Sequence, residues 1–218
     1  MSYFDRTDAG KKLASALNRF KGKDAVVLAL PRGGIVLGAV IARKLEVPLG
    51  LILVRKISHP YSPEYAIGAV VEDEEPVFNE SESLYADRKW LDTAVASARE
   101  LINRRRELYY GDDFHPPEVA GKTVIIVDDG IATGLTMTAS VKAMRSKHAG
   151  RVVVAVPVAS SDSVEGLEAL ADEVIVLDNP NAFMGAVGVH YRHFDQVEDK
   201  QVKKILREVS HELQQTAS

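Results

Sequence analysis

Two adjacent carboxylates, Asp128 and Asp129, stand directly before a short segment of glycine, threonine and small apolar residues, Gly130 to Thr136. Adjacent carboxylates can accept hydrogen bonds from the diol of a sugar, and they can help to hold Mg²⁺. Glycine lets the backbone approach a phosphate without a Cβ in the way, and Thr133 and Thr136 add hydroxyl donors. These residue types in this order predict a site that binds an anion beside a diol or a divalent cation.

A buried strand and a helix are expected to position this segment. The apolar run from Val124 to Val127 is too short and too rich in β-branched residues for a helix, so it predicts a buried parallel strand. Residues Met137 to Lys147 have helical composition. A segment that opens a helix presents unpaired N–H groups and the positive end of the helix dipole, which bind anions. An ordinary strand–turn–helix corner with solvated aspartates is the competing interpretation, and the complete order of residues disfavours it.

The stretch from Thr123 to Thr136, TVIIVDDGIATGLT, resembles the fingerprint of the type I phosphoribosyltransferases, which bind 5-phosphoribosyl-1-pyrophosphate (PRPP). The resemblance implies that Asp128 and Asp129 are catalytic residues that hold the ribose hydroxyls, with a weak role in holding Mg²⁺ through the ribose or water. It implies that the 5′-phosphate of PRPP is bound by six consecutive residues, Ile131, Ala132, Thr133, Gly134, Leu135 and Thr136. The fingerprint is specific for the fold and says little about the substrate.

A second unit of the same kind lies nearer the N-terminus. The apolar run AVVLAL predicts a buried strand, and the turn PRGG that follows it leads into a helix over residues 35–45. Taken alone, an ordinary turn between a strand and a helix is the favoured interpretation. Beside the acid pair, the resemblance implies that Arg32, Gly33 and Gly34 bind the pyrophosphate of PRPP. It also implies that the peptide bond between Pro31 and Arg32 is cis.

Two further cations, Arg55 and Lys56, follow the next predicted strand, which lies within Val47 to Val54. Charged side chains at the end of a buried strand must reach either solvent or a ligand, and the residues alone leave both open. The stretch LILVRK resembles the corresponding strand of the adenine phosphoribosyltransferases. That resemblance implies that Arg55 and Lys56 contact the pyrophosphate.

The segment from Ile57 to Glu64, ISHPYSPE, carries two prolines and predicts a loop. Its place matches the mobile loop that closes over the site in this family and excludes water, so we expect it to be mobile without ligand. Family members that act on 6-oxopurines carry an acid/base aspartate where Ala132 stands here, whereas adenine-type enzymes use a Glu-Tyr pair in the mobile loop. Glu64 and Tyr65 stand in a comparable place, so Glu64 is a candidate catalytic acid/base; a carboxylate that faces solvent is an equal alternative.

Two other regions are expected to pack around this core. Residues 81–117 predict an inserted helical block with a long helix from Asp92 to Tyr109, whose arginine run at positions 104–106 suits a solvated face better than a nucleic-acid patch. Residues 178–195 are irregular, and the resemblance makes them a small hood that recognises the base. Phe183 or Tyr191 could stack on that base, and packing is an equal alternative for each.

Composition limits the class of protein. The chain has 218 residues, of which 46% are hydrophobic and 27% charged, as expected for a single α/β domain spanning residues 1–218. Cysteine is absent, so there is no disulfide framework, and the net charge of −4 argues against a nucleic-acid partner. The first ten residues do not resemble a signal peptide, and no apolar run approaches the roughly 20 residues of a membrane span. We therefore expect a cytoplasmic protein with no membrane partner, and homodimer formation is left open.

The alternation of strands and helices predicts an α/β fold with a mostly parallel sheet flanked by helices. The resemblance implies a phosphoribosyltransferase that transfers phosphoribose from PRPP to a nitrogenous base, with purines among the candidates, and releases pyrophosphate. It also implies Mg²⁺ as cofactor, held mainly by the polyphosphate. A regulatory protein that senses PRPP without transferring it is the alternative, and a scaffold with a relic loop is a third possibility. The residues do not identify the acceptor base.

Overall fold

A five-stranded parallel sheet forms the centre of the molecule. The structure is a computed structural model and describes residues 2–59, 61–79, 87–111 and 114–216. The strands lie side by side in the order β2-β1-β6-β7-β8, and every neighbouring pair is parallel. Their bounds are β1 (Ala25–Ala29), β2 (Leu49–Leu51), β6 (Thr123–Val127), β7 (Arg151–Val156) and β8 (Glu173–Val176). This topology confirms the predicted α/β class.

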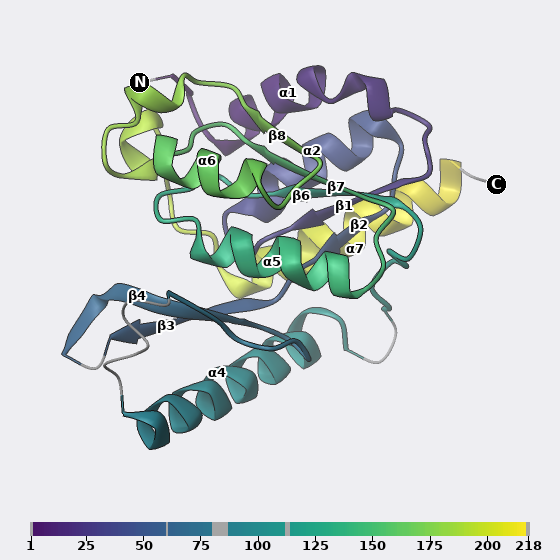
Figure 1. The fold of residues 1–218 in the computed structure, drawn as a ribbon. Coiled ribbons are helices and arrows are strands. Elements are labelled where there is room, and N and C mark those ends of the chain that lie inside the picture. The colour runs from purple at the N-terminus through teal and green to yellow at the C-terminus, as the bar shows by residue number, and fades with distance from the viewer. Residues whose placement is uncertain (1, 60, 80–86, 112–113, 217–218) are drawn as a thin grey trace.

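Helices cover both faces of this sheet (Figure 1). Side chains alternate along each strand, so Val27 of β1 lies in one core and its neighbour Val26 in the other. The core that contains Val27 is shared with α1 (Arg6–Ala16), α2 (Gly34–Leu45) and α7 (Asp199–Thr216). The core that contains Val26 is shared with α5 (Leu135–Ser146) and α6 (Ser161–Glu168). Within the described ranges, no helix is long and apolar enough to cross a membrane.

A smaller antiparallel sheet lies beyond α5, with α4 on its outer side (Figure 1). It consists of β3 (Val54–His59), β4 (Ser62–Val71) and β5 (Val77–Phe78), and α4 spans Arg88–Tyr109. Ile57 and Ile67 of this sheet share a core with Ile102 of α4, whereas Val71 shares a core with α5. Asp87 begins α4 because its carboxylate accepts a hydrogen bond from the N–H group of Trp90 at 2.8 Å.

The loop predicted over residues 57–64 is wrong, because most of this segment belongs to the two strands of a hairpin. His59 pairs with Ser62 and Ser58 with Ala66, and the register shifts on both sides of Ser58. Ile57 is buried, which anchors β3 in the core beneath α4. Prolines favour loops in sequence, but a strand tolerates them where their nitrogens need no partner in the ladder. The predicted mobility of this segment stays a prediction.

The remaining elements are one helical turn after α1 and two more in the hood, all of them 3₁₀ helices. Helix α1 ends at Ala16 and is followed by η1 (Asn18–Phe20). The irregular region 178–195, here called the hood, contains η2 (Pro180–Ala182) and η3 (Val187–His190).

The chain leaves β1 and β6 in opposite directions. From β1 it passes through α2 to β2 on one side, and from β6 it passes through α5 to β7 on the other. Adjacent parallel strands with diverging connections leave a crevice at their carboxyl ends, which is where open α/β sheets bind ligands. The turn after β1 and the acid pair after β6 therefore meet at one crevice.

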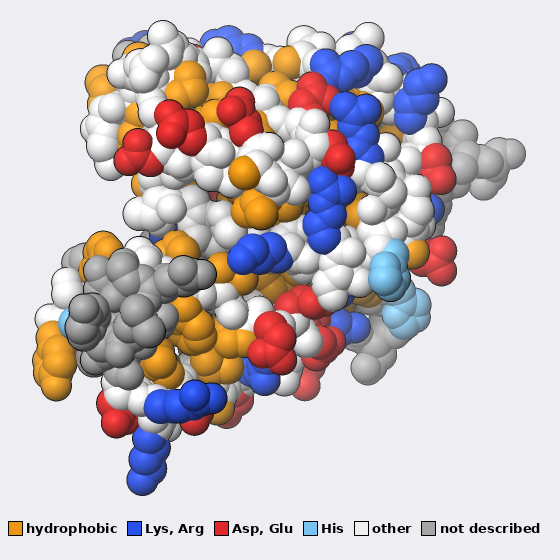
Figure 2. All heavy atoms as spheres, in the orientation of Figure 1, with side chains coloured by type: hydrophobic (Ala, Val, Ile, Leu, Met, Phe, Trp, Pro, Cys, Tyr) orange, Lys and Arg blue, Asp and Glu red, His pale blue; other side chains and the backbone are white. Residues whose placement is uncertain are grey.

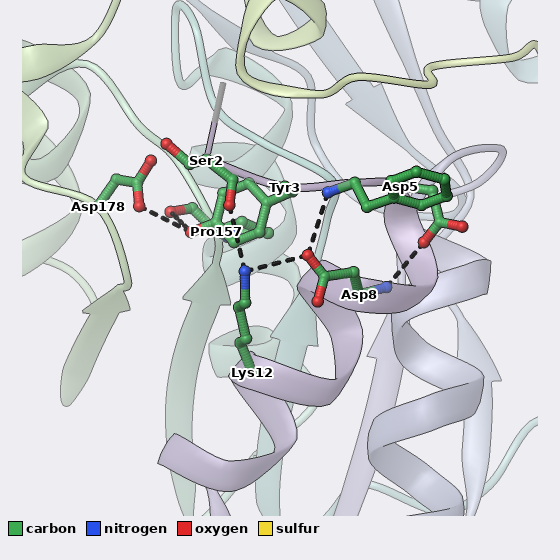
Figure 3. Close-up of polar contacts among 8 residues, drawn as sticks. Ser2, Tyr3, Asp5, Asp8, Lys12, Pro157 and Asp178 are labelled. Atoms are coloured by element: carbon green, nitrogen blue, oxygen red, sulfur yellow. Dashed lines mark hydrogen bonds and ion pairs between the residues drawn. The ribbon is translucent and has the colours of Figure 1, made fainter.

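The N-terminal segment 2–6 contacts both ends of the hood, through the Tyr3 side chain at Asp178 (Figure 3) and through its backbone at residues 192–193. The backbone of Tyr3 and that of Phe4 accept hydrogen bonds from the N–H groups of Arg192 and His193, each at 2.9 Å. The Tyr3 hydroxyl lies 2.9 Å from an Asp178 carboxylate oxygen and 3.2 Å from the Pro157 carbonyl oxygen. Burial, together with the bond to Asp178, raises the pKa of Tyr3 above its usual range. These contacts position the start of α1.

We expect Tyr3→Phe to lower the free energy of unfolding by about 1 kcal/mol, because Asp178 and a buried carbonyl lose their hydroxyl partner. Urea denaturation followed by circular dichroism measures this change. Tyr61→Phe is the matched control, because Tyr61 is 92% exposed. Equal unfolding free energies for the two variants would show that the Tyr3 hydroxyl does not hold the N-terminal segment in place.

Candidate functional site

A cavity of about 380 Å³ lies at the carboxyl ends of β1 and β6. Its wall includes the acid pair Asp128 and Asp129, residues 130–134 with Thr136, two cations of β3 and Arg105 of α4. In Figure 2 the surface is indented at the left, between the part built on the five-stranded sheet above and the small sheet below. The fold thus brings the acid pair, most of the predicted 5′-phosphate segment and the cations Arg55 and Lys56 to one cavity.

The acid pair is held by short polar contacts. An oxygen of the Asp128 carboxylate accepts a hydrogen bond from the N–H group of Asp129 at 2.8 Å. Asp129 Oδ2 accepts a hydrogen bond from Arg6 Nε, also at 2.8 Å. A Cβ at Gly33 would lie 1.8 Å from the same Asp129 oxygen, so glycine is required where the turn after β1 passes the acid pair.

Arg6 is a site residue that sequence reasoning missed. It lies in the first turn of α1, 123 residues before Asp129. Its Nη1 donates to the backbone oxygen of Asp195 at 2.6 Å, and its guanidinium carbon lies 3.8 Å from the centre of the Phe194 ring. The hydroxyl of Tyr191 donates to the backbone carbonyl of Asp129 at 2.6 Å. The N-terminal segment and the hood therefore both contribute to holding Asp129 in place. No local sequence pattern around Arg6 indicates this role.

The environment disfavours a full negative charge on both acids. Burial and then the charge of Asp129 raise the pKa of Asp128 well above its ordinary value, while Lys56 and Arg6 oppose the shift. Burial also raises the pKa of Asp129, and the charge of Arg6 again opposes it. A ligand that brings hydroxyl donors or a cation would favour the ionised pair.

The segment after the acid pair has the geometry of an anion-binding turn. Gly134 has a φ of +74° and begins α5, so the first N–H groups of the helix open toward the cavity wall that this segment forms. The Ala132 carbonyl accepts hydrogen bonds from the hydroxyls of Ser160 and Ser163 at 2.7 Å and 3.0 Å. The start of α6 therefore satisfies the Ala132 carbonyl. Ala132 and Thr133 themselves are exposed. Leu135, predicted with the same group, is not on the cavity wall.

Cations reach the cavity from the small sheet. Arg55 and Lys56 of β3 are exposed and line it, and their predicted contact with pyrophosphate stays a prediction. The predicted residues Arg32, Gly33 and Gly34 do not line the cavity, although Pro31 before them does. A Cβ at Gly34 would come within 2.8 Å of the Val127 carbonyl oxygen, so this turn packs tightly against the end of β6. The Pro31–Arg32 peptide bond is cis, as the resemblance predicted.

The remaining predicted residues have mixed outcomes. The side chain of Glu64 lies outside the described part of the structure, which places only its backbone, in β4. Tyr191 is 3% exposed and contacts Tyr3 and Phe194, so packing is its role in this structure. Phe183 stacks on His190 with ring centres 5.4 Å apart. Neither aromatic ring is on the cavity wall, and the hood contributes Val187 instead.

The donor set fits a metal ion that arrives with its own oxygen ligands. Across the described ranges, no group of three or more His, Cys, Asp or Glu side chains is arranged to hold a metal ion. Mg²⁺ keeps several waters and phosphate oxygens and needs only one or two carboxylates from a protein. Asp128 and Asp129 could supply them, so the residues fit Mg²⁺ carried by a polyphosphate.

Comparisons with known proteins identify the family of this chain. A family model described as a phosphoribosyl transferase domain matches residues 3–192, and the chain belongs to this family. Two curated Mycobacterium tuberculosis relatives, from strains CDC 1551 / Oshkosh and ATCC 25618 / H37Rv, are named "Putative phosphoribosyl transferase" MT0597 and Rv0571c. Each is 40% identical over 205 residues, which are 93% of this chain and 46% of the relative. The chain thus spans about half the length of these relatives.

A solved structure shares the fold over nearly the whole chain. The crystal structure of TT1426 from Thermus thermophilus is 41% identical in sequence and superposes with a TM-score of 0.79. The match covers 95% of this chain and 99% of that one.

We expect Gly33→Ala to lower the free energy of unfolding by about 1–3 kcal/mol, because the new methyl group would displace the Asp129 carboxylate or Arg6. The control is Gly166→Ala in α6, where an added Cβ meets nothing within 4 Å. That change should raise the unfolding free energy by up to about 1 kcal/mol through helix propensity. Chemical denaturation of both variants measures these changes in unfolding free energy, which should have opposite signs. A Gly33→Ala protein that is more stable than the parent would contradict the described packing.

We expect Asp128→Asn to raise the free energy of unfolding at pH 7 to 8. The pKa of Asp128 in the folded protein lies above its ordinary value of 3.8, so the folded state favours the protonated carboxyl. This carboxyl stabilises the fold fully below pH 3.8, and the stabilisation is lost as the pH rises through the folded-state pKa. Asparagine does not ionise, so the variant does not lose stability in this way. The difference in unfolding free energy between the variant and the parent should therefore shrink toward pH 4. Denaturation at several pH values measures the trend, with the exposed Asp73→Asn as control. A variant that is less stable than the parent at pH 8 would contradict the assignment.

Proposed function

We propose that the protein is a phosphoribosyltransferase that transfers phosphoribose from PRPP to a nitrogenous base and releases pyrophosphate. The observation that supports this most is the convergence of an acid pair, an anion-binding turn and cations on one cavity of about 380 Å³. A cavity of this size suits a small ligand. PRPP carries a diol, a phosphate and a pyrophosphate, and the cavity offers a matching group for each.

In this proposal each part of PRPP faces a different element. The ribose hydroxyls contact Asp128 and Asp129, and the 5′-phosphate lies on the turn 131–136 at the start of α5. The pyrophosphate contacts Arg55 and Lys56 of β3. The turn 32–34 after β1 supports this arrangement, because Gly33 packs against the Asp129 carboxylate.

The reaction breaks the bond between ribose C1 and the pyrophosphate oxygen and forms a bond from C1 to a ring nitrogen of the base. Positive charge develops on the ribose, as in glycoside hydrolysis. Asp128 and Asp129 orient the sugar, and the cations of β3 stabilise the negative charge that gathers on the leaving pyrophosphate. Mg²⁺, when bound, adds further neutralisation of the polyphosphate. Glu64 remains the candidate that accepts the proton released by the base.

The acceptor is a planar nitrogenous base in this proposal, with purines among the candidates. Leu30, Val54 and Val187 contribute apolar side chains to the cavity wall, where the flat face of a base could pack. Ala132 occupies the position at which 6-oxopurine enzymes carry a carboxylate, so the acid/base must come from another element.

We expect isothermal titration calorimetry with Mg²⁺ to detect PRPP binding by the parent and at least about tenfold weaker binding by Asp128→Asn/Asp129→Asn, because the diol loses its charged acceptors. Asp73→Asn, which replaces an exposed carboxylate outside the cavity, should bind like the parent. Unchanged affinity in the double variant would remove the acid pair from the proposal.

A panel of nitrogenous bases then tests the reaction itself, with pyrophosphate release as the readout. Turnover of any base with PRPP would support the transferase. Tight PRPP binding without turnover across the panel would favour the regulatory alternative, and absence of PRPP binding would contradict both.

A further inference from the structure

One arginine of the run 104–106 on α4 faces the cavity, although the sequence predicted a solvated face for all three. Arg105 is partly buried and lies on the cavity wall, whereas Arg104 and Arg106 are exposed. Successive residues of an α-helix point about 100° apart, so at most one of three neighbours can face a given site. Arg106 instead forms an ion pair with Glu72, at the end of the small sheet.

Arg105 has no carboxylate partner among the residues that the structure describes. The charges of Arg105 and Arg32 both oppose the rise in the pKa of Tyr109 that burial causes. The phenol itself donates to Asp199 of α7 at 2.5 Å. A partly buried cation without a counter-charge is unfavourable by itself, and an anionic ligand would relieve this.

The charges on the cavity wall leave room for a multiply charged anion. Arg55, Lys56 and Arg105 face two carboxylates, and one of these, Asp129, is already paired with Arg6. Lys56 opposes the rise in the pKa of Asp128, and neither Arg55 nor Arg105 forms an ion pair with another described residue. An anion with at least two charges would restore the balance.

The end of α4 is held rigidly around Arg105. The Tyr109 hydroxyl is bonded to α7, and the Tyr110 hydroxyl accepts a hydrogen bond from the N–H group of Leu51 in β2 at 2.8 Å. The ion pair of Arg106 adds a third attachment, to the end of β4. A binding group on such an anchored helix is positioned before the ligand arrives, which lowers the cost of binding.

We propose that Arg105 is a pyrophosphate-binding residue, so that α4 completes the site that β3 begins. This proposal rests on the proposed function. The planar guanidinium group of arginine can give two parallel hydrogen bonds to a phosphate, and it stays charged at all relevant pH values. Arg105 would therefore bind the pyrophosphate of PRPP and stabilise it as a leaving group.

The test compares Arg105→Gln with Arg104→Gln in calorimetric titrations of the full chain with inorganic pyrophosphate and Mg²⁺. Both variants lose one positive charge from adjacent positions on the same helix, so long-range electrostatics change equally. We expect about tenfold weaker binding in Arg105→Gln and less than about twofold in Arg104→Gln, as one lost charged hydrogen bond predicts. Arg105→Lys should fall between Arg105→Gln and the parent, because lysine keeps the charge and loses the paired geometry.

Two further measurements separate this proposal from the proposed function. Unfolding free energies of the three variants, compared with the parent, show whether weaker binding reflects a damaged fold. Equal affinities of Arg105→Gln and Arg104→Gln, with Arg55→Gln or Lys56→Gln clearly weaker, would overturn the role of Arg105 and leave the proposed function intact. A parent that binds neither pyrophosphate nor PRPP would overturn both.

Discussion

Two partly buried carboxylates, side by side at the end of β6, are the constraint on which the rest of the site depends. Water cannot fully solvate Asp128 and Asp129, and each raises the cost of charge on the other. The fold supplies partial compensation through Arg6, whose Nε lies 2.8 Å from Asp129. A sugar diol with a bound cation would supply the positive charge and the hydrogen-bond donors that are still missing. The acid pair therefore lowers the stability of the protein without ligand and favours ligand binding.

The compensation comes from parts of the chain that are remote in sequence. The N-terminal segment 2–6 reaches the acid pair only because it pairs with the end of the hood, where Tyr191 also holds the Asp129 backbone. On the opposite side, β3 and α4 supply cations from an independent small sheet. The cavity is therefore an interface between two packed units, and its charge pattern depends on how α5 and the small sheet meet.

The local pattern of apolar residues correctly predicted the elements that carry the acid pair. It gave a wrong prediction where the same residues suit more than one structure. The runs that became β1, β6 and β7 are short, apolar and buried on both faces, which restricts them to a parallel sheet. Residues 57–64 contain two prolines and read as a loop, but pairing of His59 with Ser62 and burial of Ile57 make them a hairpin. Arg105 could not be separated from its arginine neighbours, because the direction of a helical side chain toward the cavity depends on where the helix packs.

The sequence by itself determined the α/β class, the order of strand, acid pair, glycine-containing turn and helix, and the cations that come after β2 in the chain. These follow from side-chain periodicity and backbone freedom, which act over a few residues. Only the tertiary structure decided that Arg6 pairs with Asp129, that Gly33 must lack a Cβ, that Tyr191 packs in the hood, and that Arg105 faces the cavity. Each of these depends on contacts between distant segments, and such contacts leave no periodic signal in one sequence because any surface arginine, glycine or tyrosine could have made them.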